Sequence, residues 1–334
     1  MMDFDLDPKE FEDTARAVME ACAEAAPPAR ARLLAEAGLI GVAAPETIGG
    51  LGLPLDFAVP VVAAAGEGLL GFPLMEAMLV ARALAEFDAA EAEAVITGET
   101  TVTIAWQGVA EDGVVGAAPM GETVDRVVIF RADGSAVLAR IGATIAPRRG
   151  ATLDIETPEA RFVLTGQLDG IELSVDAVET LCSDAMVLRS AFVRGSAEKC
   201  LALAVEYAQD RSQFGKPLSA NQVIRHRLSR DKLATETMRN ALARALTEVP
   251  GGDVHLAREA CWLATARAGI AVAESAIQVF GGMGFTWEVP LHRHLRQMRT
   301  QAQAGGVAEK TEALGQRLIG ASTNAWYGEI ANVV

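Results

Sequence analysis

Two short stretches carry residue types that are suited to binding a charged or aromatic ligand. Arg211 and Phe214 stand close together, ahead of a turn that Gly215 and Pro217 favour. A guanidinium donates forked, charge-assisted hydrogen bonds to phosphate, and a phenyl ring offers a flat apolar surface to a base. Taken alone, such a pair is more often a surface arginine beside a core phenylalanine.

The second stretch is a helix end that precedes a pair of glycines. Gln278 ends a predicted helix, and Gly281 and Gly282 come just after it. Because glycine has no side chain, the backbone at this point can approach a bound diphosphate closely. A lone glycine pair usually does no more than stop a helix.

Neither the histidines nor the cysteines form a metal-binding pattern. His292 and His294 are two positions apart, and on a helix such residues point to different sides. The cysteines form no CxxC pair and are expected to be reduced and buried: Cys22, Cys182, Cys200 and Cys261. We expect no metal site.

The elements that must position these residues follow a helical, β, helical order. Apolar residues recur every three or four positions over 1–99, alternate over parts of 100–176, and return to helical spacing over 177–334. We therefore predict an N-terminal helical domain, a middle β domain and a C-terminal helical bundle with these bounds. Helices are expected at 56–67, 74–86, 184–211, 222–246 and 255–280, and short strands at 101–105, 126–130, 136–140 and 171–175.

Composition and charge narrow the class of protein. The 334 residues are 51% hydrophobic but only 5% aromatic, which favours packed helices over a β-sandwich. The formal net charge of −15 argues against nucleic acid and anionic membrane as partners. The N-terminus lacks the basic residues of a signal peptide, and no run of about 18 uncharged apolar residues is present. We expect a soluble, cytoplasmic protein.

Three stretches together resemble the acyl-CoA dehydrogenase family: 34–52, 207–217 with Gln222 just beyond it, and 276–286. The last two read YAQDRSQFGKP and AIQVFGGMGFT and are highly specific, whereas the first is weak by itself. The family fold has an N-terminal α-helical domain, a middle β-barrel-like domain and a C-terminal four-helix bundle. It is therefore mainly α with a central β domain, in agreement with the order of elements above.

The resemblance implies that this chain contacts FAD. In the family, the arginine that matches Arg211 meets the FAD pyrophosphate, and the phenylalanine that matches Phe214 packs on the adenosine half. FAD lies across a subunit interface, and its ring is held mainly by the neighbouring subunit. An oligomer is thus implied, either of this chain with itself or with a related acyl-CoA dehydrogenase chain. The matching cofactor-binding residues are Arg211, Phe214, Gln222, Gln278, Gly281 and Gly282.

The positions of the catalytic base depart from the family pattern. The reaction removes a proton from Cα and a hydride from Cβ, so a carboxylate must stand near Cα. Most members place this Glu where Gly305 stands here, and a minority place it where Leu188 precedes Arg189. We leave the catalytic residue unassigned and interpret the nearby Asp184 and Glu309 as helix-surface charge.

The β domain departs as well. Most members carry a Thr-Glu-Pro-Gly-like loop after the first strand and a later Trp-Ile-Thr-like strand, which contact the flavin ring and the acyl-CoA. Here the first strand runs into Trp106, Gln107 and Gly108, and no Trp-Ile-Thr stretch follows. The resemblance therefore does not extend to a flavin-ring site in this chain.

We hypothesise that the chain forms 2-enoyl-CoA from an acyl-CoA thioester with FAD as hydride acceptor. Its pattern resembles the base-lacking subunit of the heteromeric acyl-CoA dehydrogenases of bacterial steroid side-chain breakdown, in which a partner chain supplies the Glu and the flavin-ring contacts. Two alternatives stay open. One is a non-catalytic scaffold of the same fold, and the other is a flavin enzyme with altered chemistry, such as a monooxygenase or a nitroalkane oxidase.

Overall fold

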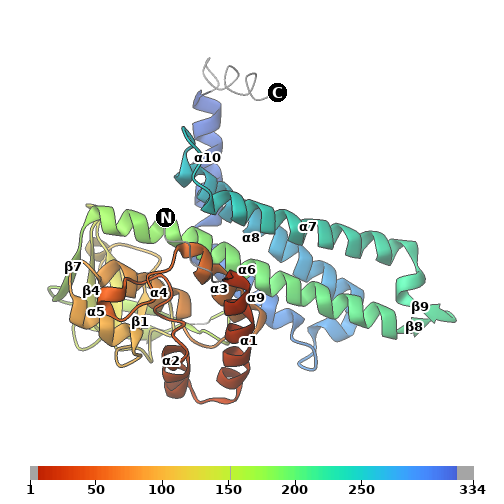
Figure 1. Cartoon of the computed structure of the whole chain (residues 1–334), viewed down its shortest axis with the longest axis horizontal. Coiled ribbons are helices and arrows are strands. Elements are labelled where there is room, and N and C mark those ends of the chain that lie inside the picture. Colours follow the sequence, from red (N-terminus) through yellow and green to blue (C-terminus); the bar gives the residue numbers. More distant parts are fainter. Residues whose placement is uncertain (1–6, 151, 322–334) are drawn as a thin grey trace.

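Long helices and small β-sheets form the part of the chain that the computed structural model describes, residues 7–150 and 152–321 (Figure 1). Helices come first: α1 (Pro8–Glu24), α2 (Pro27–Glu36), α3 (Ala58–Glu67), α4 (Leu74–Leu84) and α5 (Ala89–Ile96). Strands follow: β1 (Val102–Ile104), β2 (Val114–Pro119), β3 (Arg126–Phe130), β4 (Ala136–Arg140), β5 (Ile145–Arg149), β6 (Glu159–Leu164) and β7 (Gly170–Leu173). The remainder is α6 (Val175–Asp210), the hairpin β8 (Ser212–Gln213) and β9 (Lys216–Pro217), α7 (Gln222–Leu246), α8 (Val254–Phe280), α9 (Leu291–Ala304) and α10 (Val307–Ala321).

The strands form sheets with the orders β1-β3-β4-β7 and β2-β6-β5, in which β1 pairs with β3 in parallel. The predictions at 126–130 and 136–140 match β3 and β4, whereas β2, β5 and β6 were not predicted. β5 is an edge strand that contains Pro147, Arg148 and Arg149, so its sequence lacks an apolar alternation. The apolar faces of the sheets enclose a core that contains Val115, Phe162 and Ile129.

The long helix α6 begins at Val175, earlier than the predicted residue 184. Its first turn is capped by Ser174, whose hydroxyl accepts the backbone N–H of Ala177 at 3.3 Å. The strand predicted at 171–175 accordingly ends at Leu173. The prediction at 222–246 matches α7, and the prediction at 255–280 differs from α8 by its first residue.

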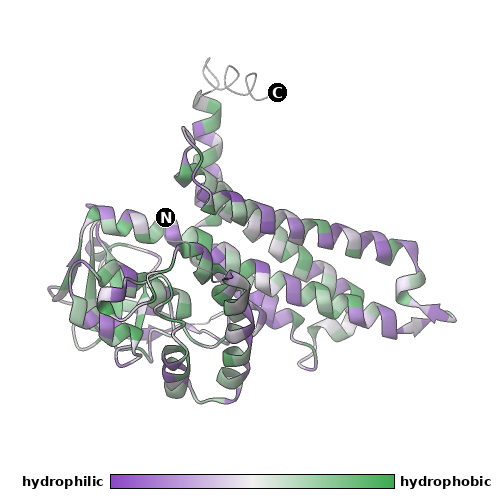
Figure 2. Ribbon diagram, viewed as in Figure 1, coloured by the Kyte–Doolittle hydropathy of each residue, from purple (hydrophilic) through white to green (hydrophobic). Residues whose placement is uncertain are grey.

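The bundle buries α8 among its neighbours. Within the described residues, only the stretch Val254–Phe285 is long and apolar enough to cross a membrane by length and composition, and 44% of its most apolar window is buried. Its Trp262, Leu263 and Val272 side chains belong to a core that α6 and α9 share. This burial is typical of a central bundle helix. The outer helix α7 is largely hydrophilic on its surface (Figure 2).

Two glycines allow α3 and α6 to cross closely. A Cβ on Gly195 of α6 would lie 1.9 Å from the Ala63 carbonyl oxygen, and a Cβ on Gly66 of α3 would lie 2.1 Å from the Phe192 carbonyl oxygen. Each glycine thus faces the backbone of the other helix. This crossing fixes the N-terminal helices on the bundle.

The N-terminal helices and one of the sheets share a single apolar core. It includes Leu34, Leu79, Leu138 and Leu188, from α2, α4, β4 and α6. The boundary expected after residue 99 falls between α5 and β1, and the boundary expected after residue 176 falls in the first turn of α6. The division into three domains stays a prediction.

Candidate functional site

An aromatic stack brings the two predicted binding stretches to one end of the bundle. The rings of Tyr207 on α6 and Phe280 on α8 are stacked with their centroids 4.1 Å apart. Arg211 is the C-cap of α6, and Gln278 lies in the last turn of α8. The backbone N–H of Leu218, just ahead of α7, donates to the Arg211 carbonyl oxygen at 2.8 Å. This end lies at the right of Figure 1, where β8 and β9 project.

The β8–β9 hairpin presents Phe214 to solvent. Ser212 pairs with Pro217 and Gln213 pairs with Lys216, which leaves Phe214 and Gly215 as the turn. Phe214 has a φ of 54° and is 97% exposed. A bulky residue with positive φ is strained by about 1 kcal/mol or more, and such strain is commonly found at functional sites. The turn therefore holds the Phe214 ring away from the rest of the chain, where it can contact another molecule.

The glycine pair also faces open space. Gly281 has a φ of 66°, and a Cβ on either Gly281 or Gly282 would meet no atom within 4 Å. Beside them lies a cavity of about 520 Å³, whose lining includes Gln278, Arg296 and Arg299. The exposed backbone and Arg296 suit an anionic group, whereas Arg299 is paired with Glu274, which lines the same cavity.

We name the segment from Arg211 to Lys232 the basic end. It contains six lysines and arginines and one aspartate, in a chain whose formal net charge is −15. Within the described residues, the Arg211 guanidinium has no hydrogen bond or ion pair, and Gln222 and Gln278 are exposed. The donors and rings of this end fit the diphosphate and adenosine of FAD.

A second region, which we call the active-site cavity, is lined by one of the two positions where the family resemblance predicts a base, and the other position lies next to it in α6. This cavity of about 680 Å³ lies between α6, the turn from α9 to α10, and the loop after β1. Gly305 and Arg189 both line it, and Leu188 is buried beside Arg189 in α6. Among the described residues that line the cavity, Glu309 is the carboxylate.

Trp262 occupies the space that a side chain at position 305 would need. A Cβ on Gly305 would lie 2.5 Å from the Trp262 ring. The indole N–H of Trp262 also donates to the Gly305 carbonyl oxygen at 3.1 Å, and Trp262 is fully buried. A glutamate therefore does not fit at this position without displacement of the indole.

A buried cluster of charged and aromatic groups forms the floor of the active-site cavity. The Arg189 guanidinium lies over the Trp106 ring, 4.3 Å from its centroid, and donates to the Gln301 carbonyl oxygen at 3.4 Å. The Trp106 indole N–H donates to Glu76 at 3.0 Å. Burial lowers the pKa of Arg189 to about 10, against the opposing effect of Glu76 and Glu159. Burial likewise raises the pKa of Glu76, which the Arg189 charge and the Trp106 hydrogen bond offset in part.

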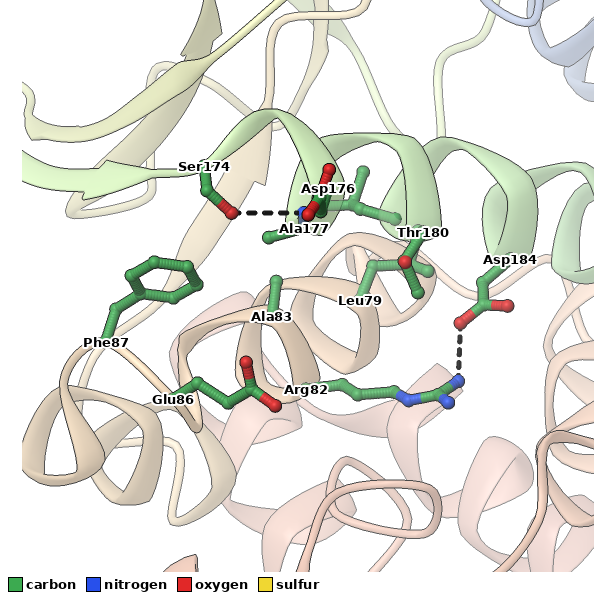
Figure 3. Close-up of a pocket in the computed structure, with 11 residues that line it drawn as sticks. Leu79, Arg82, Ala83, Glu86, Phe87, Ser174, Asp176, Ala177, Thr180 and Asp184 are labelled. Carbon is green, nitrogen blue, oxygen red and sulfur yellow. Dashed lines mark hydrogen bonds and ion pairs between the residues drawn. The ribbon is translucent and has the colours of Figure 1, made fainter.

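Asp184, considered from the sequence as a nearby acid, belongs to a different cavity (Figure 3). Its carboxylate pairs with Arg82 and, at 2.8 Å, with Arg258. The side chain is 4% exposed, so Asp184 is a buried ion-pair partner and not a surface charge. This correction leaves Glu309, which is exposed at the start of α10, as the acid at the active-site cavity.

The two histidines considered from the sequence are separate buried groups. His294 Nδ1 lies 2.7 Å from the Ser196 hydroxyl, and burial lowers the pKa of His294 to about 3. His292 packs edge-on against Trp287. No group of three or more histidines, cysteines or acids that could hold a metal ion occurs in the described part of the chain.

Sequence reasoning missed Glu76. It lies in an otherwise apolar helix, and only the fold brings it to Trp106 across 30 positions of the chain. A single acid within the buried stretch Leu74–Leu84 was a usable signal, because acids are rarely fully buried without a partner.

Comparison with known proteins shows the family to which this chain belongs. Residues 184–318 match a family model described as acyl-CoA dehydrogenase, C-terminal domain. The acyl-CoA dehydrogenase IpdE2 of Mycobacterium tuberculosis is 30% identical over 279 residues, which cover 81% of this chain and 80% of the relative. FadE27 of the same organism is 26% identical over 330 residues, covering 86% and 87%.

Solved structures share the fold. The ChsE4-ChsE5 complex from Mycobacterium tuberculosis contains a chain with a TM-score of 0.83 at 23% identity, with coverage of 97% of this chain and 100% of that one. A Tcur3481-Tcur3483 steroid ACAD variant gives a TM-score of 0.81 at 22% identity, with coverage of 95% and 99%.

The fold and the matched C-terminal region define an oxidoreductase of the type that acts on CH–CH donors. This chain belongs to the acyl-CoA dehydrogenase family.

Proposed function

We propose that this chain is the base-lacking subunit of a heteromeric, FAD-dependent acyl-CoA dehydrogenase. The enzyme would take an acyl-CoA thioester to its 2-enoyl form, with FAD as the hydride acceptor. Arg211 and Phe214 would hold the pyrophosphate and the adenosine half of FAD, and Gln222, Gln278, Gly281 and Gly282 would complete that side of the site. A related chain would supply the catalytic Glu and the flavin-ring contacts.

The observation that carries the proposal is the active-site cavity. Both positions where the family keeps a base lie at this cavity or directly behind it, and they hold Gly305 and Leu188. The Trp262 ring fills the space beside Gly305, so the glycine is part of a packed arrangement. The basic end, in contrast, keeps exposed groups suited to FAD. A chain that keeps the FAD-binding groups but lacks the catalytic base is suited to sharing an active site with another chain.

The likeness to chains from two heteromeric assemblies supports a related chain as the partner, because the ChsE4-ChsE5 complex and the Tcur3481-Tcur3483 steroid ACAD each combine two named proteins. We also propose a cytoplasmic location, which the unpaired thiols of Cys22, Cys182, Cys200 and Cys261 support.

The test is anaerobic bleaching of flavin absorbance by a panel of acyl-CoA thioesters. The isolated chain and its coexpressed complex with a base-bearing acyl-CoA dehydrogenase chain are compared. We expect bleaching by the complex, and a rate for the isolated chain that is lower by about 10²–10⁴-fold, the usual contribution of a positioned acid or base.

A Glu309→Gln variant is the matched control, because Glu309 is the acid at the active-site cavity. Rapid bleaching by the isolated chain that Glu309→Gln abolishes would show that this chain owns a base and would overturn the proposal. A complex that forms but binds no flavin would favour the scaffold alternative.

A further inference from the structure

The ends of α6 and α8 are joined by a pair of stacked rings. The rings of Tyr207 and Phe280 have their centroids 4.1 Å apart and their planes at 15° to each other. Tyr207 lies in the last turn of α6, which ends at Asp210, and Phe280 is the last residue of α8. The stack therefore fixes the two helix ends relative to each other.

Each ring also adjoins one of the two stretches that contain the predicted FAD contacts. The carbonyl oxygen of Tyr207 accepts the backbone N–H of Arg211 at 2.9 Å. Phe280 directly precedes Gly281 and follows Gln278 by two positions. The stack thus links the backbone that carries Arg211 to the backbone that carries the glycine pair.

The position of Arg211 depends on its backbone. Within the described residues, its exposed guanidinium has no hydrogen bond or ion pair. Its backbone is held by Tyr207 on one side and by Leu218 on the other, whose N–H donates to the Arg211 carbonyl oxygen at 2.8 Å. Tyr207, Leu218 and Phe280 are half-buried against the same apolar core. Because the last turns of helices fray readily, the packing of Tyr207 decides how well Arg211 is held.

We propose that Tyr207 is a positioning residue for the FAD side of the site. Its stack on Phe280 holds Arg211 and the backbone of Gly281 and Gly282 at the separation that one diphosphate requires. The inference rests on the proposed function, because it takes these groups as FAD contacts. Groups that are already ordered bind more tightly, since the cost of ordering them is not incurred during binding.

The experiment measures FAD affinity of the heteromeric complex by flavin fluorescence during titration. The parent is compared with Tyr207→Ala, with Arg211→Ala and with the double variant. We expect Tyr207→Ala to bind FAD about three- to tenfold more weakly, which corresponds to the usual contribution of a stacked aromatic pair. The double variant should lose less than the product of the two single losses, because Tyr207 acts in part through Arg211.

Tyr207→Phe and Phe11→Ala are the matched controls. The first keeps the ring and should bind FAD as the parent does. The second removes one ring of another aromatic pair, Phe11 and Phe57, whose centroids are 5.6 Å apart in the N-terminal helices. Phe11→Ala should lower the unfolding temperature and leave FAD affinity unchanged. An equal loss of affinity in Phe11→Ala and Tyr207→Ala would show a general effect of lost stability and would overturn the inference.

The Arg211→Ala arm separates this inference from the proposed function. If Arg211→Ala binds FAD weakly while Tyr207→Ala stays within about twofold of the parent, the positioning role is wrong and the proposed function stands. If Arg211→Ala binds FAD as the parent does, the FAD assignment fails and the inference fails with it. Losses that multiply fully in the double variant would also overturn the positioning role. If Tyr207→Ala does not fold, Phe280→Ala takes its place with the same expected result.

Discussion

At the scale of single residues, Gly305 and Trp262 explain why a base is not easily restored. The Gly305 carbonyl oxygen accepts the Trp262 indole N–H, and a Cβ on Gly305 would meet the indole ring at 2.5 Å. The two residues are packed as a pair. Most members of the family have a glutamate at this position, but here the Trp262 ring occupies the space that its side chain needs.

We predict that Gly305→Glu does not speed flavin bleaching and destabilises the chain by about 1–3 kcal/mol, the usual cost of overpacking a core. Urea unfolding measures the stability, and anaerobic bleaching measures the rate. Gly305→Ala is the control, because it adds the same Cβ without a carboxylate. Faster bleaching by Gly305→Glu together with an undisturbed stability of Gly305→Ala would contradict the prediction.

Arg211 provides the corresponding test of the FAD side of the site. Arg211→Ala should weaken FAD binding by the heteromeric complex about ten- to a hundredfold, because a charged hydrogen bond contributes about 1.5–3 kcal/mol. Flavin fluorescence during titration measures the affinity. Arg244→Ala removes the same charge from the exposed surface of α7, outside the basic end, and should have a smaller effect. Equal affinities for the parent and Arg211→Ala would show that the assignment is wrong.

The raised pKa of Glu159 should make the stability of the chain depend on pH. Burial and then the nearby Asp154 raise its pKa from 4.5 to about 7, and its Oε1 atom has no hydrogen-bond partner. Between these values the folded chain holds a proton that the unfolded chain has released, so this group lowers stability as the pH rises through the window. Glu159→Gln should unfold at a higher temperature than the parent at about pH 8 and should show little difference at about pH 4. If the unfolding temperatures of Glu159→Gln and the parent differ by the same amount at pH 4 and at pH 8, Glu159 is not the origin of the pH dependence.

The residues of the candidate site differ in how readily the sequence reveals them. Arg211 and Phe214 are near neighbours within one motif, so a single stretch of sequence indicates them. The floor of the active-site cavity joins Glu76, Trp106 and Arg189 from three separate elements. Such a cluster depends on packing, which no local pattern contains.

At the scale of the elements, the close crossing of α3 and α6 should make the stability of the chain sensitive to an added side chain at Gly195. Gly195→Ala would place a Cβ 1.9 Å from the Ala63 carbonyl oxygen, so the helices must move apart. We expect a loss of about 1–3 kcal/mol in the free energy of unfolding, measured in urea. Gly315→Ala in α10 is the control, because its Cβ would meet no atom within 4 Å and alanine favours a helix. Equal stabilities of the two variants would argue against a tight crossing.

Helices were easier to predict than strands for a physical reason. α7 and α8 are long amphipathic or apolar segments whose periodicity extends over many turns, and their predicted bounds match closely. β5 and β6 are no shorter than β3 and β4, but β5 carries two adjacent arginines at the open edge of its sheet. Their pairing is set by neighbours distant in the chain, which a local pattern does not record.

At the scale of the whole molecule, the exposed apolar side chains near the bundle end predict assembly. Phe214, Phe285 and Trp287 are 97%, 69% and 68% exposed. Sedimentation at micromolar concentration should show an oligomer in the presence of the partner chain, and Trp287→Asp should weaken it. Ile155→Asp, which also replaces an exposed apolar side chain, serves as the control. A lone monomer with FAD fully bound would contradict the expected assembly.

The basic end also governs how quickly such an assembly can form. The segment from Arg211 to Lys232 carries six lysines and arginines and one aspartate, so its charge is opposite in sign to the −15 of the chain as a whole. An acidic surface would be drawn toward the hairpin from a distance and would arrive already oriented. The encounter rate should therefore fall steeply as salt shortens the range of the field to about 8 Å at physiological ionic strength, while the lifetime of the complex changes much less.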